Sequence, residues 1–287
     1  MIVLKTVEEV SSWRSGVGGA CVLVPTMGAL HAGHAALVTQ AASTGLPTIV
    51  SVFVNPTQFN DPADLARYPR TLETDVAVCA EAGARAVWAP DVEDVYPNGL
   101  GANSGGGAAS PELPEAATRP GLEDAHRPGH FAGVCQVVRR LFEVVRAKVA
   151  IFGEKDWQQL AVIRGMVEAE RRGPLAGAMP TILAGPTVRE ADGLAMSSRN
   201  RFLTAEDRVR ARAISRALRA SVYAGTPAQA EAVMRDVLAE ESIDPEYAVV
   251  RDAGTLGAVR PDHPARALIA ARVGSVRLID NAAWSAE

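Results

Sequence analysis

Four short runs of apolar and β-branched residues divide the first two thirds of the chain. They occupy residues 21–25, 48–54, 86–89 and 149–152. Runs of this length and composition are typical of strands that are buried on both faces of a parallel sheet. Residues 131–145 and 160–167 instead carry apolar side chains at helical spacing. The alternation predicts an α/β fold with a Rossmann-like, doubly wound parallel sheet, which binds ligands at the carboxyl ends of its strands.

The pattern changes after about Gly185. Two helices are expected at residues 205–223 and 227–241, followed by three strands at residues 247–251, 267–271 and 276–279. Helices followed by a group of strands predict a smaller C-terminal α+β domain with an antiparallel sheet. We therefore expect two domains, residues 1–185 and residues 186–287.

Composition limits the classes of partner. Hydrophobic residues make up 48% of the chain and charged residues 22%, which is typical of a globular protein, and the net charge of −4 gives no reason to expect nucleic-acid or membrane binding. The three cysteines are far apart among apolar neighbours, which indicates reduced, buried thiols in a cytoplasmic protein. No apolar run approaches the roughly 20 residues that span a bilayer.

Residues 98–121 differ from the rest of the chain. They are rich in glycine, serine and proline, a composition that buries little apolar surface. A passive surface loop and an active-site flap are both consistent with it.

The strongest local signal is the segment PTMGALHAGH at residues 25–34, which follows a predicted strand and opens a predicted helix at residues 33–42. Backbone N–H groups at a helix start favour an anion such as a triphosphate. His31 and His34 are three residues apart, so both rings can face one ligand and donate hydrogen bonds to phosphate charge. A metal-binding pair is an alternative, although no third ligand stands at suitable spacing. A structural turn with incidental histidines is another.

Two more polar clusters end predicted strands. Asn55 and Gln58 present amides that both donate and accept hydrogen bonds, although Asn-Pro is also a common turn starter. Lys155 follows the strand at residues 149–152 and can neutralise phosphoryl charge. It also stands between two acidic residues, so a salt-bridged helix cap is an alternative. Gln159, one helical turn further on, can point to the same crevice.

The last polar cluster, at residues 189–200, opens the second domain. Its glycine, its two serine hydroxyls and Arg199 suit phosphate contacts, although Ser-Ser-Arg-Asn is also a common turn. His130, at the rigid entry to a helix, is interpreted as structural. The chain has no P-loop sequence, no G-x-G-x-x-G after the first predicted strand and no G-x-S-x-G nucleophile motif.

The motifs occur in a definite order. PTMGALHAGH is followed by FVNPTQF, YPRT, RPGHFAGV, FGEKDWQQL and READGLAMSSRN. In this order they resemble the pantoate–β-alanine ligase family, the pantothenate synthetases, over essentially the whole chain. The first resembles the His-x-Gly-His signature of the nucleotidylyl-transferase superfamily, which includes class I aminoacyl-tRNA synthetases. The last is similar to that superfamily's mobile Lys-Met-Ser-Lys-Ser loop, with serines and Arg199 in place of the lysines.

This resemblance implies an AMP-forming ligase of coenzyme A precursor biosynthesis. The carboxylate of pantoate would attack the α-phosphate of ATP, giving pantoyl adenylate and pyrophosphate, and β-alanine would then displace AMP to form pantothenate. The resemblance also implies Mg²⁺, mainly as the ATP complex, and a cytoplasmic homodimer with no nucleic-acid or membrane partner. Residues 1–185 would bind ATP and pantoate, and residues 186–287 would form a lid.

The resemblance further implies the site residues. Catalytic roles would fall to His31, His34, Lys155 and Arg199. The residues expected to contact ATP are Met27, Gly28, Ala29, Leu30, His31, Ala32, Gly33, His34, Gly153, Glu154, Lys155, Asp156, Val188, Met196, Ser197, Ser198 and Arg199. The residues expected to contact substrate are Gln58 (pantoate and β-alanine), Gln159 (pantoate), Asn55, Tyr68, Glu123 and Arg127. The metal ligands are left unassigned, with Asp75 only a possible neighbour of the metal.

The chain departs from the family pattern at a few positions. Asp124 stands where glycine is common, Gln136 where threonine is usual, and Trp157 where phenylalanine or tyrosine is more frequent. A nucleotidylyl transferase that keeps the nucleotide on its product is the main alternative function. A tRNA synthetase is disfavoured by the lack of a basic surface run. A non-enzymatic nucleotide-binding regulator would be expected to lack Lys155 or the histidine pair.

Overall fold

A computed structural model describes residues 1–59, 62–100 and 112–285. The chain divides into two compact units. The first unit comprises Met1–Glu154 and Gln159–Gly185, and the second comprises Lys155–Gln158 and Pro186–Glu287. The inclusion of Lys155–Gln158 in the second unit is not evident from the sequence. Of the predicted loop or flap at residues 98–121, residues 101–111 lie outside the described residues.

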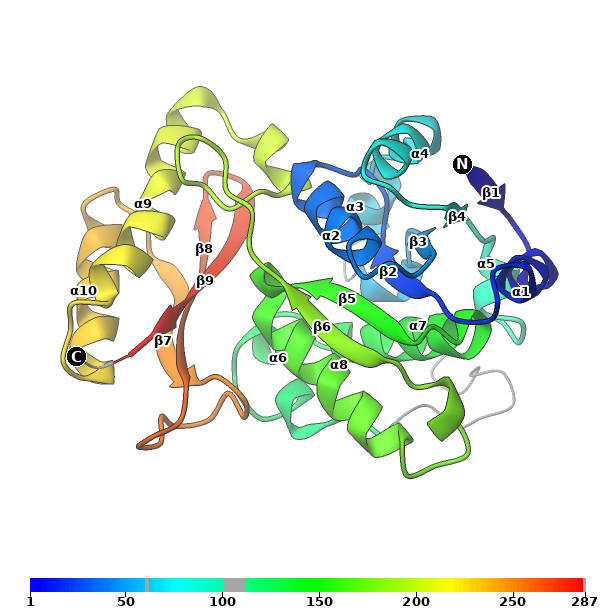
Figure 1. Ribbon diagram of the computed structural model, residues 1–287. Coiled ribbons are helices and arrows are strands. Elements are labelled where there is room, and N and C mark those ends of the chain that lie inside the picture. The colour runs from blue at the N-terminus through cyan, green and yellow to red at the C-terminus, as the bar shows by residue number, and fades with distance from the viewer. Residues whose placement is uncertain (60–61, 101–111, 286–287) are drawn as a thin grey trace. The chain divides into compact units, whose positions relative to one another are not determined.

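Six strands of the first unit form a parallel sheet in the order β1-β4-β3-β2-β5-β6 (Figure 1). Their bounds are β1 (Ile2–Leu4), β2 (Val22–Thr26), β3 (Thr48–Val52), β4 (Ala86–Trp88), β5 (Val149–Gly153) and β6 (Thr181–Gly185). From β2 the chain adds β3 on one side of this strand and later adds β5 on the other side. The direction in which successive strands are added therefore reverses at β2. The predicted doubly wound fold is confirmed, and its switch point lies at the carboxyl end of β2.

The sequence does not predict β1 and β6, which form the two edges of this sheet. Ile2 is 52% exposed and Leu183 of β6 is 36% exposed. An edge strand is covered less completely than a central one, so its residues need not form a continuous apolar run. The four predicted strands are the central ones, and the structure places each within two residues of its predicted bounds.

Helices cover both faces of the sheet, with α2 (Ala32–Ala42) and α4 (Leu72–Glu81) on one face and α7 (His130–Val145) and α8 (Trp157–Glu170) on the other (Figure 1). The remaining helices are α1 (Val7–Gly16), α3 (Pro62–Arg67), α5 (Val92–Val95), α6 (Glu123–His126) and the short 3₁₀ segments η1 (Pro56–Gln58), η2 (Glu115–Ala117), η3 (Glu154–Asp156) and η4 (Ala176–Ala178). Alternate strand residues Val22, Val24 and Val50 share a buried cluster with α2. The helical stripe predicted at residues 160–167 is buried.

The second unit contains a three-stranded antiparallel sheet in the order β7-β8-β9, as predicted. The strands are β7 (Pro245–Asp252), β8 (Ala265–Val273) and β9 (Val276–Trp284), and the helices are η5 (Ser198–Phe202), α9 (Ala205–Ser221) and α10 (Pro227–Ala239). Helices α9 and α10 share a buried apolar cluster with the sheet. Strand β9 extends to Trp284, well beyond the predicted end at residue 279.

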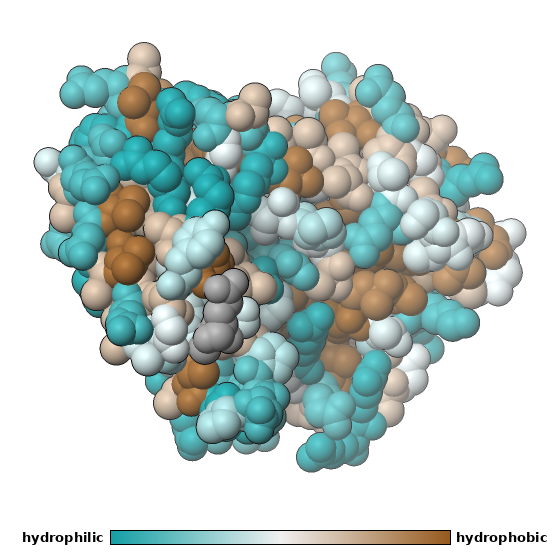
Figure 2. Space-filling model, turned by 60° about the vertical axis from the view of Figure 1, so that its left-hand side comes forward, coloured by the Kyte–Doolittle hydropathy of each residue, from teal (hydrophilic) through white to brown (hydrophobic). Residues whose placement is uncertain are grey.

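Several arginines of α9 lie on a polar helix face. Arg212, Arg216 and Arg219 are exposed, and Arg210 pairs with Asp207 at 3.1 Å. Hydrophilic and hydrophobic areas of comparable extent lie side by side on the face drawn in Figure 2. Within residues 1–59, 62–100 and 112–285, no helix has the length and apolar character needed to cross a membrane.

Candidate active site

The loop between β2 and α2 carries the histidine motif, and a buried carboxylate fixes its backbone. Gly28 and Ala29 both have positive φ angles, +79° and +51°. Asp75, in α4, is 1% exposed and accepts hydrogen bonds from the N–H groups of Ala29 (3.1 Å) and Leu30 (2.8 Å). A side chain at Gly28 would meet this carboxylate, because an added Cβ would lie 3.0 Å from its Oδ2. Asp75 therefore acts on the loop conformation, a role that the sequence does not reveal.

The two histidine rings lie against each other at the start of α2, and each accepts a backbone hydrogen bond. His31 is the N-cap residue, and its Nδ1 accepts from the N–H of Gly33 at 3.1 Å. The Nδ1 of His34 accepts from the N–H of His31 at 3.3 Å, and the ring centroids are 4.1 Å apart. A neutral imidazole that accepts at Nδ1 carries its proton at Nε2. Both rings therefore carry a proton at Nε2, and their hydrogen bonds to a phosphate stay a prediction.

Several backbone amides of this loop are hydrogen-bonded within the protein. The N–H groups of Ala29, Leu30, His31 and Gly33 all donate to side chains of the protein itself. The sequence predicts that such groups bind an anion, whereas in this structure these four donors are paired within the protein. The contact of this loop with ATP stays a prediction. Among the described residues, no group of three or more His, Cys, Asp or Glu is placed to hold a metal ion.

Asn55 is 1% exposed, and its hydrogen bonds lie within the protein. Its Oδ1 accepts from the hydroxyls of Tyr96 (2.6 Å) and Thr57 (3.1 Å), and its Nδ2 donates to the carbonyl of Gly133 at 3.2 Å. Burial raises the pKa of Tyr96, which keeps that phenol a neutral donor. This geometry favours the turn-forming interpretation of Asn55, while its contact with substrate stays a prediction.

Gln58 follows in η1 and lies beside several predicted substrate residues. Gln58 is 9% exposed, and its backbone carbonyl oxygen accepts from Arg127 at 3.3 Å and lies 3.3 Å from Nδ1 of His130. Arg127 also pairs with Glu123 at 3.8 Å. The structure thus brings together η1, α6 and the start of α7. The burial of His130, which is 7% exposed, agrees with its structural interpretation.

Tyr68 and Gln159 belong to the same unit. Tyr68 packs edge-on against Phe59, with ring centroids 5.4 Å apart. Gln159 is half-buried in the first turn of α8. Gly153 ends β5, and Glu154 opens the 3₁₀ segment η3 that leads to Lys155.

In the second unit, the segment before η5 forms a tight hairpin. Val188 accepts from the N–H of Met196 at 2.9 Å, and Glu190 accepts from Gly193 at 2.8 Å. The hairpin leads directly into Ser197, whose hydroxyl caps η5 by accepting from the N–H of Arg199 at 3.3 Å. The predicted phosphate contacts Ser197, Ser198 and Arg199 therefore follow one another at the start of a short helix.

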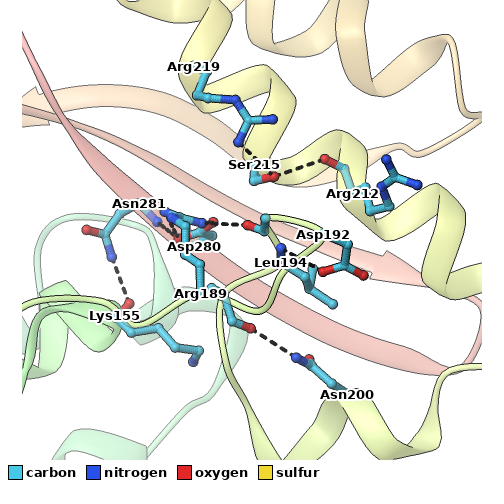
Figure 3. Close-up of polar contacts among 12 residues, drawn as sticks. Lys155, Arg189, Asp192, Leu194, Asn200, Arg212, Ser215, Arg219, Asp280 and Asn281 are labelled. Atoms are coloured by element: carbon cyan, nitrogen blue, oxygen red, sulfur yellow. Dashed lines mark hydrogen bonds and ion pairs between the residues drawn. The ribbon is translucent and has the colours of Figure 1, made fainter. Parts of the chain in front are cut away.

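Buried and partly buried polar contacts fix this hairpin. Asn200 is 6% exposed and donates to Glu190 (2.6 Å) and to the carbonyl of Ala195 (3.0 Å). Arg208 forms an ion pair with Glu190 and a second one, at 3.0 Å, with Asp192. Arg189 donates to Asp280 of β9 at 2.6 and 3.1 Å (Figure 3).

Lys155 lies in the turn before α8 and is attached to β9. Its Nζ is 3.6 Å from Asp156, so the predicted ion pair with a flanking acid is present, and its side chain is 20% exposed. The carbonyl of Lys155 accepts from Nδ2 of Asn281 at 2.7 Å, while the lysine side chain extends away from that amide (Figure 3). Asp280 and Asn281 are not predicted from the sequence. An acid and an amide within an apolar strand are the signal that could have pointed to them.

Comparisons with known proteins cover nearly the whole chain. Residues 2–283 match the family model described as pantoate-beta-alanine ligase. The chain is 47% identical over 290 residues to a pantothenate synthetase of Cereibacter sphaeroides, with 97% of this chain and 98% of the relative covered. It is 47% identical over 276 residues to that of a Nocardioides species, with 90% and 77% covered.

Solved structures give the same family. The pantothenate synthetase of Thermus thermophilus superposes with a TM-score of 0.86 at 39% identity and covers 98% of this chain and 99% of its own. A pantoate-beta-alanine ligase from Francisella tularensis, described as a complex with beta-gamma ATP and beta-alanine, superposes with a TM-score of 0.78 at 31% identity. The coverage is 99% of this chain and 97% of that one.

Proposed function

This chain belongs to the pantoate–β-alanine ligase family, and from that premise we propose how its residues carry out the ATP-dependent formation of pantothenate. The reaction joins the carboxylate of pantoate to the amine of β-alanine. A carboxylate is a poor electrophile, so it must first acquire a leaving group. ATP supplies that group.

The reaction has two displacements. A carboxylate oxygen of pantoate attacks the α-phosphorus of ATP, the bond to the β-phosphate bridging oxygen breaks, and pyrophosphate leaves. The amine of β-alanine then attacks the acyl carbon of pantoyl adenylate, the acyl–oxygen bond breaks, and AMP leaves as the nitrogen gives up a proton. Neither displacement changes an oxidation state.

His31 and His34 act on the first displacement. Their Nδ1 atoms accept backbone N–H groups, which sets the tautomer that carries a proton at Nε2. Two oriented N–H donors stabilise the negative charge that builds on the phosphate as pyrophosphate departs. Neutral donors are sufficient for this role, so neither ring has to change its protonation state.

Lys155 and the start of η5 supply the positive charge. The ammonium group of Lys155 binds phosphate oxygens, and the guanidinium of Arg199 suits two oxygens at once. Ser197 and Ser198 add hydroxyl donors, and Val188 contacts the adenine. The hairpin that precedes Ser197 is supported by Asn200 and Arg208. Met27–His34 and Gly153–Asp156 complete the proposed ATP contacts.

The pantoate side is built from amides. Gln58 and Gln159 donate to the carboxylate and accept from the hydroxyls of pantoate, and Gln58 also places β-alanine. Tyr68, Glu123 and Arg127 are proposed as further contacts. The network of Gln58 with Arg127 and Glu123 supports this assignment, because it orders η1 from a neighbouring helix.

Mg²⁺ is proposed to arrive as the ATP complex. In the part of the chain that the structure describes, no cluster of three or more His, Cys, Asp or Glu offers a ligand set, and Asp75 is occupied by backbone amides. Mg²⁺ at nucleotide sites is held largely by phosphates and water. No step is therefore assigned to a protein-bound metal.

A cytoplasmic homodimer is proposed as the working form. The resemblance to the family supports the dimer, and three unpaired, buried thiols are consistent with a reducing compartment. Light scattering coupled to size exclusion would measure the mass. A monomer at micromolar concentration would contradict the dimer.

The observation that carries the proposal is the family match over residues 2–283, with the paired imidazoles at the switch point of the sheet. The test is incubation with ATP, Mg²⁺, pantoate and β-alanine, with AMP and the amide measured together. Omission of β-alanine should leave pantoate-dependent exchange of labelled pyrophosphate into ATP. A stable nucleotide–pantoate product that β-alanine does not consume would instead indicate a nucleotidylyl transferase.

A further inference from the structure

Two adjacent polar residues interrupt the apolar strand β9. Asp280 is 4% exposed and Asn281 is 3% exposed. Neighbouring residues of a strand point to opposite faces. Asp280 shares its face with Leu278, which belongs to the apolar core of the second unit, and with Ala282, which packs against that core, so Asn281 lies on the other face. Polar groups this deeply buried are kept only where they are hydrogen-bonded.

Asn281 is hydrogen-bonded on both sides of its amide. Its Nδ2 donates to the carbonyl of Lys155 at 2.7 Å, and its Oδ1 accepts from Nε of Arg266 at 2.5 Å. Arg266 lies in β8, and its guanidinium carbon is 3.5 Å from the ring centroid of Trp157. The indole N–H of Trp157 donates to the carbonyl of Ala253 at 2.9 Å. The turn from Lys155 to Trp157 is thus attached to the rest of the second unit at three points.

Asp280 keeps this part of β9 in place. Arg189 donates to it with two nitrogens, and one of them also donates to the carbonyl of Gly193 at 3.2 Å. Such a bidentate pair, with the carboxylate buried, is geometrically specific. Figure 3 shows Asp280 directed to Arg189 and Asn281 directed to Lys155 from neighbouring positions of the strand. Asn281 therefore projects from a strand that is itself fixed.

We propose that Asn281 is a positioning residue that holds the backbone of Lys155, so that the lysine side chain starts from a fixed point when it binds phosphate. The inference rests on the proposed role of Lys155. A displacement of about 1 Å in a charged group can lower a rate by up to about 10²-fold, so a carbonyl held by a buried amide is a sensitive point of control.

The test uses the nearly isosteric variant Asn281→Asp, which keeps the acceptor for Arg266 and replaces the donor to Lys155 with an oxygen. We expect kcat of pantoate-dependent pyrophosphate exchange to fall roughly 10-fold or more, while KM for pantoate changes less than about twofold. Asn281→Ala removes the same donor without adding a charge and serves if the aspartate variant does not fold. Arg277→Ala is the matched control, because it removes a β9 contact, the 2.7 Å pair with Glu246.

A double-mutant cycle with Lys155→Ala separates positioning from general structural damage. If Asn281 acts through Lys155, Asn281→Asp lowers the rate of the Lys155→Ala enzyme by less than about twofold. If the rate of the double variant is lowered by the product of the two single-variant factors, the inference is overturned, while the ligase assignment stands.

Amide hydrogen exchange gives a readout that does not depend on catalysis. The peptide covering residues 153–158 should exchange faster in Asn281→Asp, by about tenfold, and at the normal rate in Arg277→Ala. Unchanged exchange at residues 153–158 in Asn281→Asp would overturn the inference even if every activity expected of the ligase were found.

Discussion

Lys155 combines an ammonium group, paired with a neighbouring carboxylate, with a backbone carbonyl that accepts a hydrogen bond from Asn281. Its Nζ is 3.6 Å from Asp156, whose side chain is 48% exposed. An ion pair with a partner this exposed contributes about 0–1 kcal/mol to the free energy of unfolding, so loss of the lysine side chain should cost little stability. Any large effect of its removal is therefore expected in the chemistry.

We predict that Lys155→Ala folds normally and loses adenylate formation by a factor of about 10² or more, because transferred charge is no longer neutralised. Pyrophosphate release and the melting temperature would be measured together. Lys148→Ala, an exposed lysine just before the same strand β5, is the control. Near-normal pyrophosphate release by Lys155→Ala would remove the lysine from the mechanism.

Asp75 illustrates a buried charge that acts through backbone amides. In Asp75→Asn, one carboxylate oxygen becomes an NH₂ group that faces the N–H groups of Ala29 or Leu30. We predict a loss of about 1–3 kcal/mol in the free energy of unfolding, because a buried donor is left unpaired. A lower kcat should accompany it, since the loop also carries His31.

Urea unfolding and initial rates of pyrophosphate exchange would test this prediction. Glu73→Gln, an exposed acid in the first turn of the same helix, should change neither quantity. Wild-type stability together with a wild-type rate in Asp75→Asn would show that the carboxylate does not order the loop.

At the scale of elements, the close approach of α7 to η1 depends on a residue without a side chain. A Cβ at Gly133 would lie 2.5 Å from the carbonyl oxygen of Thr57 and 2.7 Å from its hydroxyl. The carbonyl of Gly133 also accepts from Asn55. The segment that carries Gln58 is therefore packed directly on a helix backbone.

Gly133→Ala should push η1 away from α7. We predict a cost of about 1–3 kcal/mol in stability from this overpacking and a higher KM for pantoate, because Gln58 moves with η1. Gly16→Ala is the control, since its Cβ meets nothing within 4 Å in helix α1 and the change should be neutral or slightly stabilising. An unchanged KM and unchanged stability in Gly133→Ala would contradict the packing argument.

At the scale of the whole molecule, three thiols link stability to alkaline pH. Burial raises the pKa of Cys21 to about 11 and the pKa values of Cys79 and Cys135 to about 12, from an ordinary value of 9.0. At a pH between the ordinary thiol pKa and the raised one, the unfolded chain has released thiol protons that the folded chain still holds. The free energy of unfolding therefore falls as pH rises above about 9, by at most about 1.4 kcal/mol per pH unit for each thiol.

Urea unfolding at pH 8, 9 and 10 would measure this slope. Because lysines and tyrosines also titrate in this range, the comparison is with Cys135→Ala, which lacks one thiol and should show a shallower decline. The cavity left by the substitution lowers stability at every pH and does not alter the slope. Parallel curves for the two proteins would contradict the expected contribution of Cys135.

The central strands, the main helices and the antiparallel sheet of the second unit follow from the sequence because burial repeats along each element. The apolar runs at residues 21–25 and 149–152 are covered on both faces, so their composition alone indicates their place. The edge strands β1 and β6 lack that constraint. The order of the motifs likewise indicates the family. Each motif is a continuous segment, so it can be identified from the sequence without the tertiary structure.

Tertiary structure alone decides which partner a buried polar group finds. Asp75 is 45 residues from Leu30 in sequence, and Asn281 is 126 residues from Lys155. Nothing in the composition of β9 or α4 specifies those distant amide and carbonyl partners, since any buried carboxylate or amide must pair with something. The sequence by itself determined the fold class and the chemical groups of the site. Packing determined that the amides of Ala29 and Leu30 donate to Asp75 and that Asn281 of β9 donates to the carbonyl of Lys155.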